Sequence, residues 1–355
     1  MKFIRLFEII STTIHIILTH ILENMKKTQN EENDVTRWLT YRPEIKVLDC
    51  TIRDGGLMNS HNFDDDIVSA VYNTCVAAGV DYMELGYKGS KGIFSPDEYG
   101  KWKFCSEDDI KKIVGDNDSD LKLSVMADAE RTDYHTDILP KEQSPLHLIR
   151  VACYIHQIST ALDMVKDAHD KGYETAVNLM AVSIIPDREL DKAMELIAES
   201  DADIMYLVDS FGALYSEQVK HIISKYISYM EPRGKRVGMH AHNNLQLAFS
   251  NTIEAIVNGA NMLDASIAGF GRGAGNCQME LLTGFLHNPK YKSRPIYECF
   301  QKSIEPMRKD LLWGFDLPYM ITGFLNQHPR DAIKFNASEH RGNIVKFYDM
   351  LMEKE

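Results

Sequence analysis

The chain has 355 residues, of which 44% are hydrophobic, enough to bury one large core or two medium ones without disulfides. A formal net charge of -13 and the lack of a basic run argue against nucleic acid or an anionic membrane surface as a partner. The six cysteines lie apart without a CxxC pair, which is typical of reduced core thiols in a cytoplasmic protein.

Residues 1–45 differ in composition from the rest of the chain. The stretch MKFIRLFEIISTTIHIILTHILEN has basic residues ahead of an apolar run, but polar residues leave it short of the roughly 20 apolar residues of a membrane span. No small-residue cleavage site follows it, and Met25 precedes the polar run KKTQNEEND. We therefore expect residues 1–45 to be a flexible extension or an amphipathic helix, with no membrane span.

From Lys46 onward, short apolar runs alternate with amphipathic segments, as in repeated strand–helix units. Eight runs predict buried strands at 46–51, 82–86, 121–126, 148–153, 175–182, 203–209, 236–242 and 263–269. The span 46–286 is close to the ~250 residues typical of a (β/α)8 barrel. We predict an α/β fold in which this TIM barrel is the catalytic domain, with a doubly wound open sheet as the alternative.

The remaining segment, residues 287–355, has apolar residues at helical spacing separated by polar joints. It is too short to form a catalytic domain. We predict a small C-terminal helical extension of the barrel.

The active site of a (β/α)8 barrel lies at the C-terminal ends of its strands. Polar residues stand at or just beyond the end of each predicted strand: Arg53, Asp54, Glu84, Asp128, Arg150, Asn178, Asp209, Ser210, His240, His242, Asp264, Ser266 and Asn276. We therefore expect charged and amide side chains to ring one mouth of the barrel.

The run GMHAHNN carries the most specific signal, because side chains two residues apart on a strand point to the same face. His240 and His242 would then converge on one point. Together with Asp54 they form an oxygen and nitrogen ligand set that suits a divalent metal with open positions. The alternative is a pair of polar residues on a solvated strand face.

The glycine-rich run GFGRGA at 269–274 matches the GxGxxA pattern of dinucleotide sites. It follows the eighth predicted strand instead of the first, and no acidic residue ends a strand about 20 residues later. We expect its glycines to turn the backbone so that Asn276 reaches the mouth.

Three motifs in this order, DCTIRDGG (49–56), HAHNN (240–244) and GFGRGAGN (269–276), resemble those of the DRE-TIM metallolyases. That group includes 3-hydroxy-3-methylglutaryl-CoA lyase, isopropylmalate synthase and 4-hydroxy-2-oxovalerate aldolase, and the short C-terminal segment is most similar to the aldolase branch. The resemblance implies that Asp54, His240 and His242 bind Mn2+ or Mg2+. It places Asn276 as a further ligand or directly beside the ligands.

For the aldolase branch, the resemblance implies cleavage or formation of a 4-hydroxy-2-oxo acid, with pyruvate enolate and an aldehyde as the partners of the reaction. Arg53, beside a ligand and always protonated, is predicted to stabilise the enolate oxygen. We predict that the 2-oxo acid is bound by four residues at the strand ends, Glu84, Arg150, Asn178 and Ser210.

The sequence departs from the aldolase pattern at one position. A histidine is expected three residues after the metal-binding aspartate, and Leu57 stands there. His61 in the same loop or a metal-bound water is the substitute base that we predict, although the Asn62 and Asp64 cap signals fit a structural His61 equally well. The aldolases also use a tyrosine after the barrel, for which we predict Tyr319, or the position of Phe315.

Two other activities stay open at this stage. One is a Claisen-type acyl-CoA synthase or lyase of the same family, and the other is a barrel that binds a 2-oxo acid without catalysis. The resemblance also implies an acylating aldehyde dehydrogenase as a partner, and large barrels of this kind often pair, so we expect a homodimer.

Overall fold

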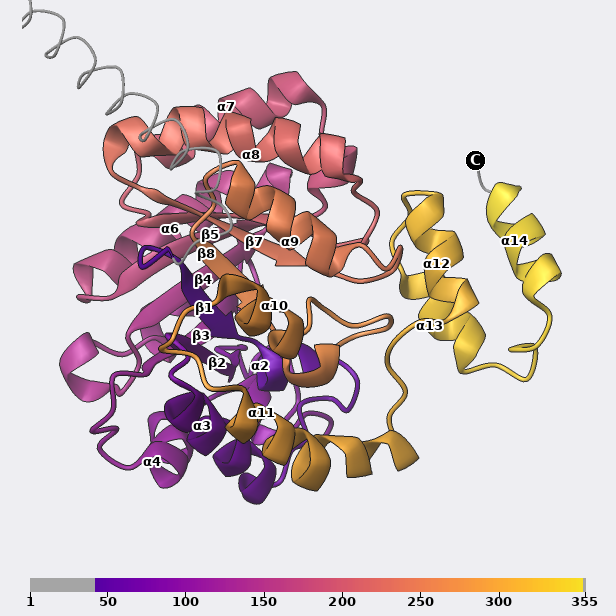
Figure 1. Cartoon of the computed structure of the whole chain (residues 1–355). Coiled ribbons are helices and arrows are strands. Elements are labelled where there is room, and N and C mark those ends of the chain that lie inside the picture. The colour runs from indigo at the N-terminus through magenta and orange to yellow at the C-terminus, as the bar shows by residue number, and fades with distance from the viewer. Residues whose placement is uncertain (1–41, 354–355) are drawn as a thin grey trace, which may run out of the picture. The chain divides into compact units, whose positions relative to one another are not determined.

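The computed structural model describes residues 42–353 and contains eight parallel strands that form a closed barrel in chain order (Figure 1). The strands are β1 (Lys46–Asp49), β2 (Tyr82–Tyr87), β3 (Lys122–Asp128), β4 (Leu148–Cys153), β5 (Glu174–Leu179), β6 (Ile204–Asp209), β7 (Arg236–Ala241) and β8 (Met262–Ala265). Parallel pairing of β1 with β8 closes the sheet. The predicted (β/α)8 barrel is confirmed, and the open sheet is excluded.

Helices connect the strands around the outside of the barrel. They are α3 (Asp65–Ala78), α4 (Glu107–Val114), α5 (Tyr134–Asp137), α6 (Ile158–Asp170), α7 (Asp187–Ala198), α8 (Ser216–Met230), α9 (Ala248–Val257) and α10 (Met279–Leu286). The sequence of α7 shows why they form: Leu190, Ala193, Met194 and Ile197 are buried at spacings of three and four residues, which makes one apolar face.

The interior of the barrel is filled by side chains that alternate along the strands. A separate apolar cluster contains Leu48, Cys50, Tyr82, Leu148, Ala176, Ile204, Tyr206, Val208 and Met262. Because residues two apart on a strand share a face, Glu84, Arg150, Asn178 and Asp264 follow members of this cluster on the inward side. The side chains that face the barrel interior are therefore apolar near the N-terminal ends of the strands and polar near the C-terminal mouth, where the site lies.

Four predicted strands end earlier than expected, among them β5, which ends at Leu179 instead of residue 182. β1 ends at Asp49 because α2 (Thr51–Gly55) begins directly after it, and β8 ends at Ala265 before a turn in which Ala268 has a φ of 54°. β7 ends at Ala241, so His242 follows the strand and is held by an isolated bridge to Asn276. The two histidines still converge, but the second is positioned by the glycine-rich loop as well as by the strand.

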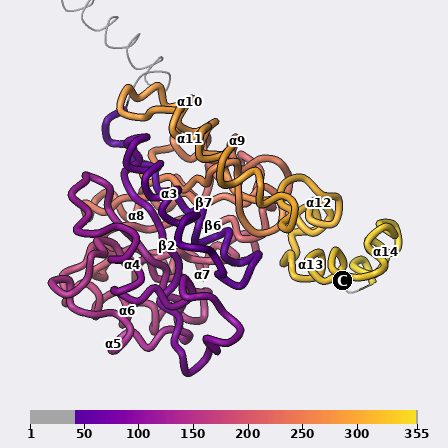
Figure 2. The backbone as a smooth tube through the Cα atoms, turned by 90° about the horizontal axis from the view of Figure 1, so that it is seen from below, coloured from indigo at the N-terminus to yellow at the C-terminus, as the bar shows by residue number. Residues whose placement is uncertain are grey.

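The C-terminal segment contains α11 (Ser293–Cys299), α12 (Leu317–Phe324), α13 (Arg330–Asn336) and α14 (Ile344–Met352). The last three lie together (Figure 2) around a small apolar cluster of Ile321, Ala332, Phe347 and Leu351. Two amide hydrogen bonds of 3.1 Å join them to the barrel loops, from Asn244 Nδ2 to the Tyr319 carbonyl and from Asn326 Nδ2 to the Ser183 carbonyl. The predicted helical extension is confirmed.

The prediction for the N-terminal extension falls almost entirely outside the described residues, and the domain boundaries at 45 and 286 stay predictions. Within residues 42–353, no helix is long and apolar enough to cross a membrane. All six cysteines are buried, as expected for core residues.

Gly238 in β7 offers a test of packing inside the barrel. A Cβ atom there would lie 2.5 Å from the Tyr206 ring, which stacks against the Arg150 guanidinium at 4.2 Å. Gly238→Ala should therefore lower the free energy of unfolding in urea by about 1–3 kcal/mol, because overpacking displaces both side chains.

Gly284→Ala is the matched control, because a Cβ atom at this position in α10 meets nothing within 4 Å. It should raise stability by about 0.5–1 kcal/mol, since alanine favours the helix. Equal effects of the two substitutions would contradict this description of the barrel interior.

Candidate active site

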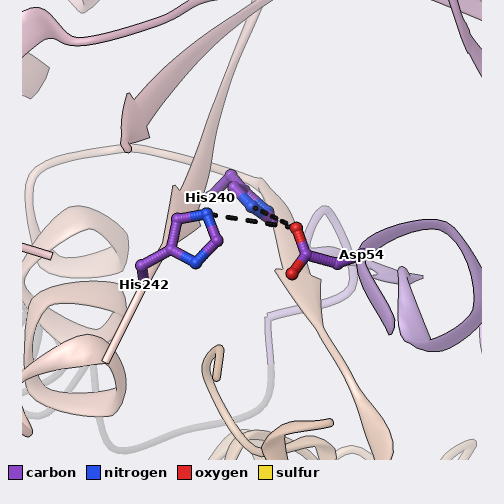
Figure 3. A group of neighbouring side chains, drawn as sticks. All are labelled: Asp54, His240 and His242. Atoms are coloured by element: carbon purple, nitrogen blue, oxygen red, sulfur yellow. Dashed lines mark ion pairs between the residues drawn. The ribbon is translucent and has the colours of Figure 1, made fainter. Parts of the chain in front are cut away.

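Asp54, His240 and His242 converge at the C-terminal mouth of the barrel (Figure 3). Each contributes one ligand atom, and these atoms lie within 4.8 Å of one another. Asp54 Oδ2 is 3.7 Å from His240 Nε2 and 4.0 Å from His242 Nε2. All three residues are buried.

The glycine-rich loop after β8 closes tightly over Asp54. The backbone N–H of Arg272 donates to Asp54 Oδ1 at 2.9 Å. A Cβ atom at Gly271 would lie 2.1 Å from Asn276 Nδ2 and 2.5 Å from Asp54 Oδ1. Only glycine therefore allows the loop to approach the aspartate so closely, which is a structural use of this run without any dinucleotide.

A closed ring of charged groups supports the three converging side chains. Arg53 bridges Asp54 Oδ2 (2.7 Å) and Glu84 Oε2 (2.6 Å). Arg150 bridges Glu84 Oε2 (2.9 Å) and Asp264 Oδ2 (2.6 Å). His240 Nδ1 lies 2.9 Å from the same Asp264 oxygen. The other ring nitrogen, His240 Nε2, lies 3.7 Å from Asp54 Oδ2 and closes the ring.

The balance of charge in this ring favours a cation. Three carboxylates face two guanidinium groups, which leaves a formal charge of -1. Burial opposes ionisation of Asp54, but the charged groups around it, with the Arg53 guanidinium at 2.7 Å, outweigh burial and hold the pKa of this carboxyl well below its usual range. Burial lowers the pKa of His242 well below its ordinary value, so its imidazole is neutral and available as a ligand.

The residues present fit a divalent metal. The Asp264 carboxylate orients His240 from behind, as carboxylates commonly do for metal-binding histidines. Asn276 Oδ1 is buried and has no hydrogen-bond partner among residues 42–353, while its Nδ2 contacts the Phe270 carbonyl at 3.4 Å. An unpaired buried oxygen beside a carboxylate and two imidazoles is a donor set that a hard or borderline cation satisfies.

A cavity of about 90 Å³ opens beside this cluster. Its polar wall includes Arg53, Asp128, Asn178, Ser210 and Arg272. Its apolar wall includes Leu57, Met126, Ala152, Met180 and Val208. The site therefore combines a candidate metal centre with room for a small molecule that has a charged end and an apolar end.

Two of the four predicted substrate-binding residues line the cavity, and the other two do not. Asn178 and Ser210 line the cavity, and both polar atoms of the buried Asn178 amide have no hydrogen-bond partner within the described chain. Glu84 and Arg150 do not line the cavity and instead form the charged ring next to it. Their predicted contact with the substrate stays a prediction, and their observed contacts are with Arg53 and Asp264.

The predicted base His61 and the predicted catalytic residue Tyr319 are not in the cavity lining. His61 is buried with a φ of 61°, and its ring packs edge-on against Tyr87 at 5.1 Å between centroids. Burial, with Lys103 and Arg53, lowers its pKa to about 3. Tyr319 lines a neighbouring cavity with Trp313, Asp316 and Arg341. The catalytic role of each stays a prediction.

Sequence reasoning missed several residues of the cavity lining, among them Arg272 and His328. Arg272 lies inside the quoted glycine-rich motif, and its Nη2 donates to the Ser210 carbonyl at 3.1 Å. His328 reaches the cavity from the connection between α12 and α13. The position of Arg272 after β8 was a usable signal, whereas nothing in the local sequence of His328 indicates that its loop folds over the barrel mouth.

A family model described as HMGL-like matches residues 44–296. The chain is 30% identical over 307 residues to 4-hydroxy-2-oxovalerate aldolase 3 of Rhodococcus opacus (strain B4), covering 83% of this chain and 89% of that protein. It is 28% identical over 302 residues to 4-hydroxy-2-oxovalerate aldolase of Moorella thermoacetica (strain ATCC 39073 / JCM 9320), covering 82% and 88%. The HMG-CoA lyase of Brucella melitensis shares the fold, with a TM-score of 0.59, 16% identity and coverage of 75% and 99%.

The contact between Asp264 and His240 predicts that the affinity of the site for metal depends on Asp264. Asp264→Asn should weaken Mn2+ binding about 10-fold or more, because the charged partner that orients and polarises the imidazole is lost. Calorimetric titration of the folded variant with Mn2+ measures this change. The control is Asp118→Asn, which alters an exposed carboxylate and should leave the affinity as it was. Equal affinities in both variants would contradict the supporting role of Asp264.

Proposed function

The chain belongs to the HMGL-like family, and we propose that it is a divalent-metal-dependent aldolase that cleaves or forms a 4-hydroxy-2-oxo acid. The products of cleavage are pyruvate and an aldehyde, which makes the enzyme a carbon–carbon lyase. The observation that carries this proposal is the position of Arg53, which lines the cavity directly beside the Asp54, His240 and His242 cluster.

Arg53 has one donor to spare for a substrate. Its Nε and Nη1 groups are bound to Glu84 and Asp54, whereas Nη2 is buried with no hydrogen-bond partner among residues 42–353. The neighbouring carboxylates hold the pKa of Arg53 above its ordinary value despite burial, so the guanidinium keeps its charge. A fixed, charged donor of this kind stabilises an enolate oxygen as negative charge develops on it.

The cluster supplies the other half of the chemistry. Mn2+ or Mg2+ held by Asp54, His240 and His242, with Asn276 beside them, would polarise the keto group of a 2-oxo acid. The buried Asn178 amide has no hydrogen-bond partner among residues 42–353, which is energetically costly. A hydrogen bond from this amide to a substrate oxygen would remove that cost. Leu57, Met126 and Val208 provide apolar contact for the carbon chain of the aldehyde half.

Pyruvate release from a panel of 4-hydroxy-2-oxo acids, with and without Mn2+, tests the proposal. The wild-type enzyme should release pyruvate only with metal, and Arg53→Ala should lower kcat about 100- to 1,000-fold, as expected for loss of an oxyanion donor. A second variant, Arg53→Lys, keeps a positive charge near Asp54 and Glu84. Circular dichroism checks that both variants fold.

The matched control is Arg294→Ala on α11, because this exposed arginine pairs only with Glu298 in the described part of the chain and should leave kcat unchanged. No pyruvate from any acid of the panel, while acetyl-CoA condenses with a 2-oxo acid, would replace the aldolase by the Claisen-type activity.

A further inference from the structure

We infer that Asp128 is the general base of the proposed aldol cleavage, an inference that rests on the proposed function. Asp128 is the last residue of β3 and lines the cavity. In the closed order of eight strands, β3 is four strands from β7, so Asp128 faces the cavity from the side opposite the two histidines. No hydrogen bond or ion pair from another described residue engages its carboxylate, which leaves the oxygens free to accept a proton.

The other proton-carrying groups of the cavity lining are less suited to accept a proton. Asp54, His240 and His242 form the candidate metal centre. The lining also contains Tyr87, Tyr154, Arg53 and Arg272. A tyrosine phenol and an arginine guanidinium keep their protons near neutral pH, which excludes these residues as bases.

His328 is the one other candidate in the described lining. Its Nδ1 accepts a hydrogen bond of 3.0 Å from the backbone N–H of Arg330. In the neutral ring the proton is then on Nε2, so the group that His328 can offer is a donor. Burial, with Arg272 and Arg330, lowers its pKa to about 4, which keeps the ring neutral at pH 7.

The loop after β1 does not supply a base to the cavity. Leu57 lines the cavity and carries no titratable group. The His61 ring is directed against the backbone of the same loop, because a Cβ atom at Gly56 would lie 2.1 Å from His61 Nδ1. Proton transfer by His61 would therefore require the loop to rearrange, whereas Asp128 already faces the space that the substrate would fill.

The position of Asp128 matches the geometry of the reaction. The hydroxyl to be deprotonated is on C4, two carbons beyond the keto carbon C2, so its base belongs across the cavity from the cluster that binds the 2-oxo end. Asp128 takes the C4 hydroxyl proton, the C4–O bond becomes the aldehyde carbonyl, and the C3–C4 bond breaks. The electron pair of the C3–C4 bond enters the pyruvate enolate. The Asp128 carboxyl then returns the proton to C3, so no other reactant is needed.

The electrostatic surroundings of Asp128 suit a base. Burial raises its pKa above the ordinary value of 3.8, and nearby cations keep the carboxylate available in its ionised form. The charged and titratable groups that face it are Lys103, Arg131, Arg53, Glu84 and Tyr87. Because the base must be ionised, kcat for cleavage should fall as pH drops through this raised pKa, and Asp128→Asn should remove that dependence.

Two reactions of the Mn2+-loaded enzyme separate proton transfer from structural damage. One is pyruvate release from 4-hydroxy-2-oxovalerate, and the other is decarboxylation of oxaloacetate, which forms the same pyruvate enolate without any hydroxyl proton to remove. Asp128→Asn should lower kcat for the first reaction about 100-fold or more, the scale of general-base catalysis, with KM little changed. It should leave oxaloacetate decarboxylation and calorimetric pyruvate binding within a few-fold of wild type, and Asp128→Glu should restore part of the cleavage.

Four outcomes would overturn the inference. Equal loss of both reactions in Asp128→Asn would mean a structural role, and unchanged cleavage would mean no role. Selective loss of cleavage in His61→Asn or His328→Asn, with Asp128→Asn active, would assign the base elsewhere. If the wild-type enzyme decarboxylates oxaloacetate but cleaves no 4-hydroxy-2-oxo acid, the proposed function itself fails, and the inference falls with it.

Discussion

The ring of buried charges through Arg53, Glu84, Arg150 and Asp264 is the constraint on which the site depends. Each arginine is held between two carboxylates, and the ring begins and ends at the metal-binding candidates Asp54 and His240. Burying a charge is costly unless it is paired, so each member fixes its neighbours. The interior of the barrel is thereby made rigid at the level where three side chains must converge.

Much of this arrangement could be predicted from the sequence, because strand periodicity and the position of a residue after a strand indicate which side chains face the barrel mouth. Asn178 and His240 lie on β5 and β7, Asp54 follows β1 on α2, and the structure places all three side chains at one cavity. His328 could not be found in this way, because it comes from a loop whose contact with the barrel depends on hydrogen bonds such as that of Asn326 to Ser183. Likewise, the local sequence of His61 does not show that its ring packs against Gly56 and Tyr87 instead of facing the cavity.

Leu57 stands where the resemblance to the aldolases predicts a histidine, so the proton-transfer group of the proposed reaction must come from another part of the barrel. Arg53 and the metal-binding candidates gather on α2, which follows β1, and at the end of β7, while the apolar Leu57 leaves the near wall without a proton acceptor. A carboxylate at the end of β3 compensates from the opposite wall, and the C-terminal segment adds His328 as a neutral donor. The same barrel can therefore keep its enolate chemistry while the proton-transfer group moves to another strand, since every strand end faces the same mouth.

The proposed function requires that the cluster of Asp54, His240 and His242 binds a divalent metal and positions a 2-oxo acid next to Arg53. A crystal structure of the protein with Mn2+ and pyruvate, with anomalous data collected for manganese, tests it most directly. We expect one anomalous peak in contact with Oδ2 of Asp54 and Nε2 of both histidines, with pyruvate in the cavity and one of its oxygens within hydrogen-bonding distance of Arg53 Nη2. Manganese bound elsewhere, or pyruvate bound away from Arg53, would contradict it.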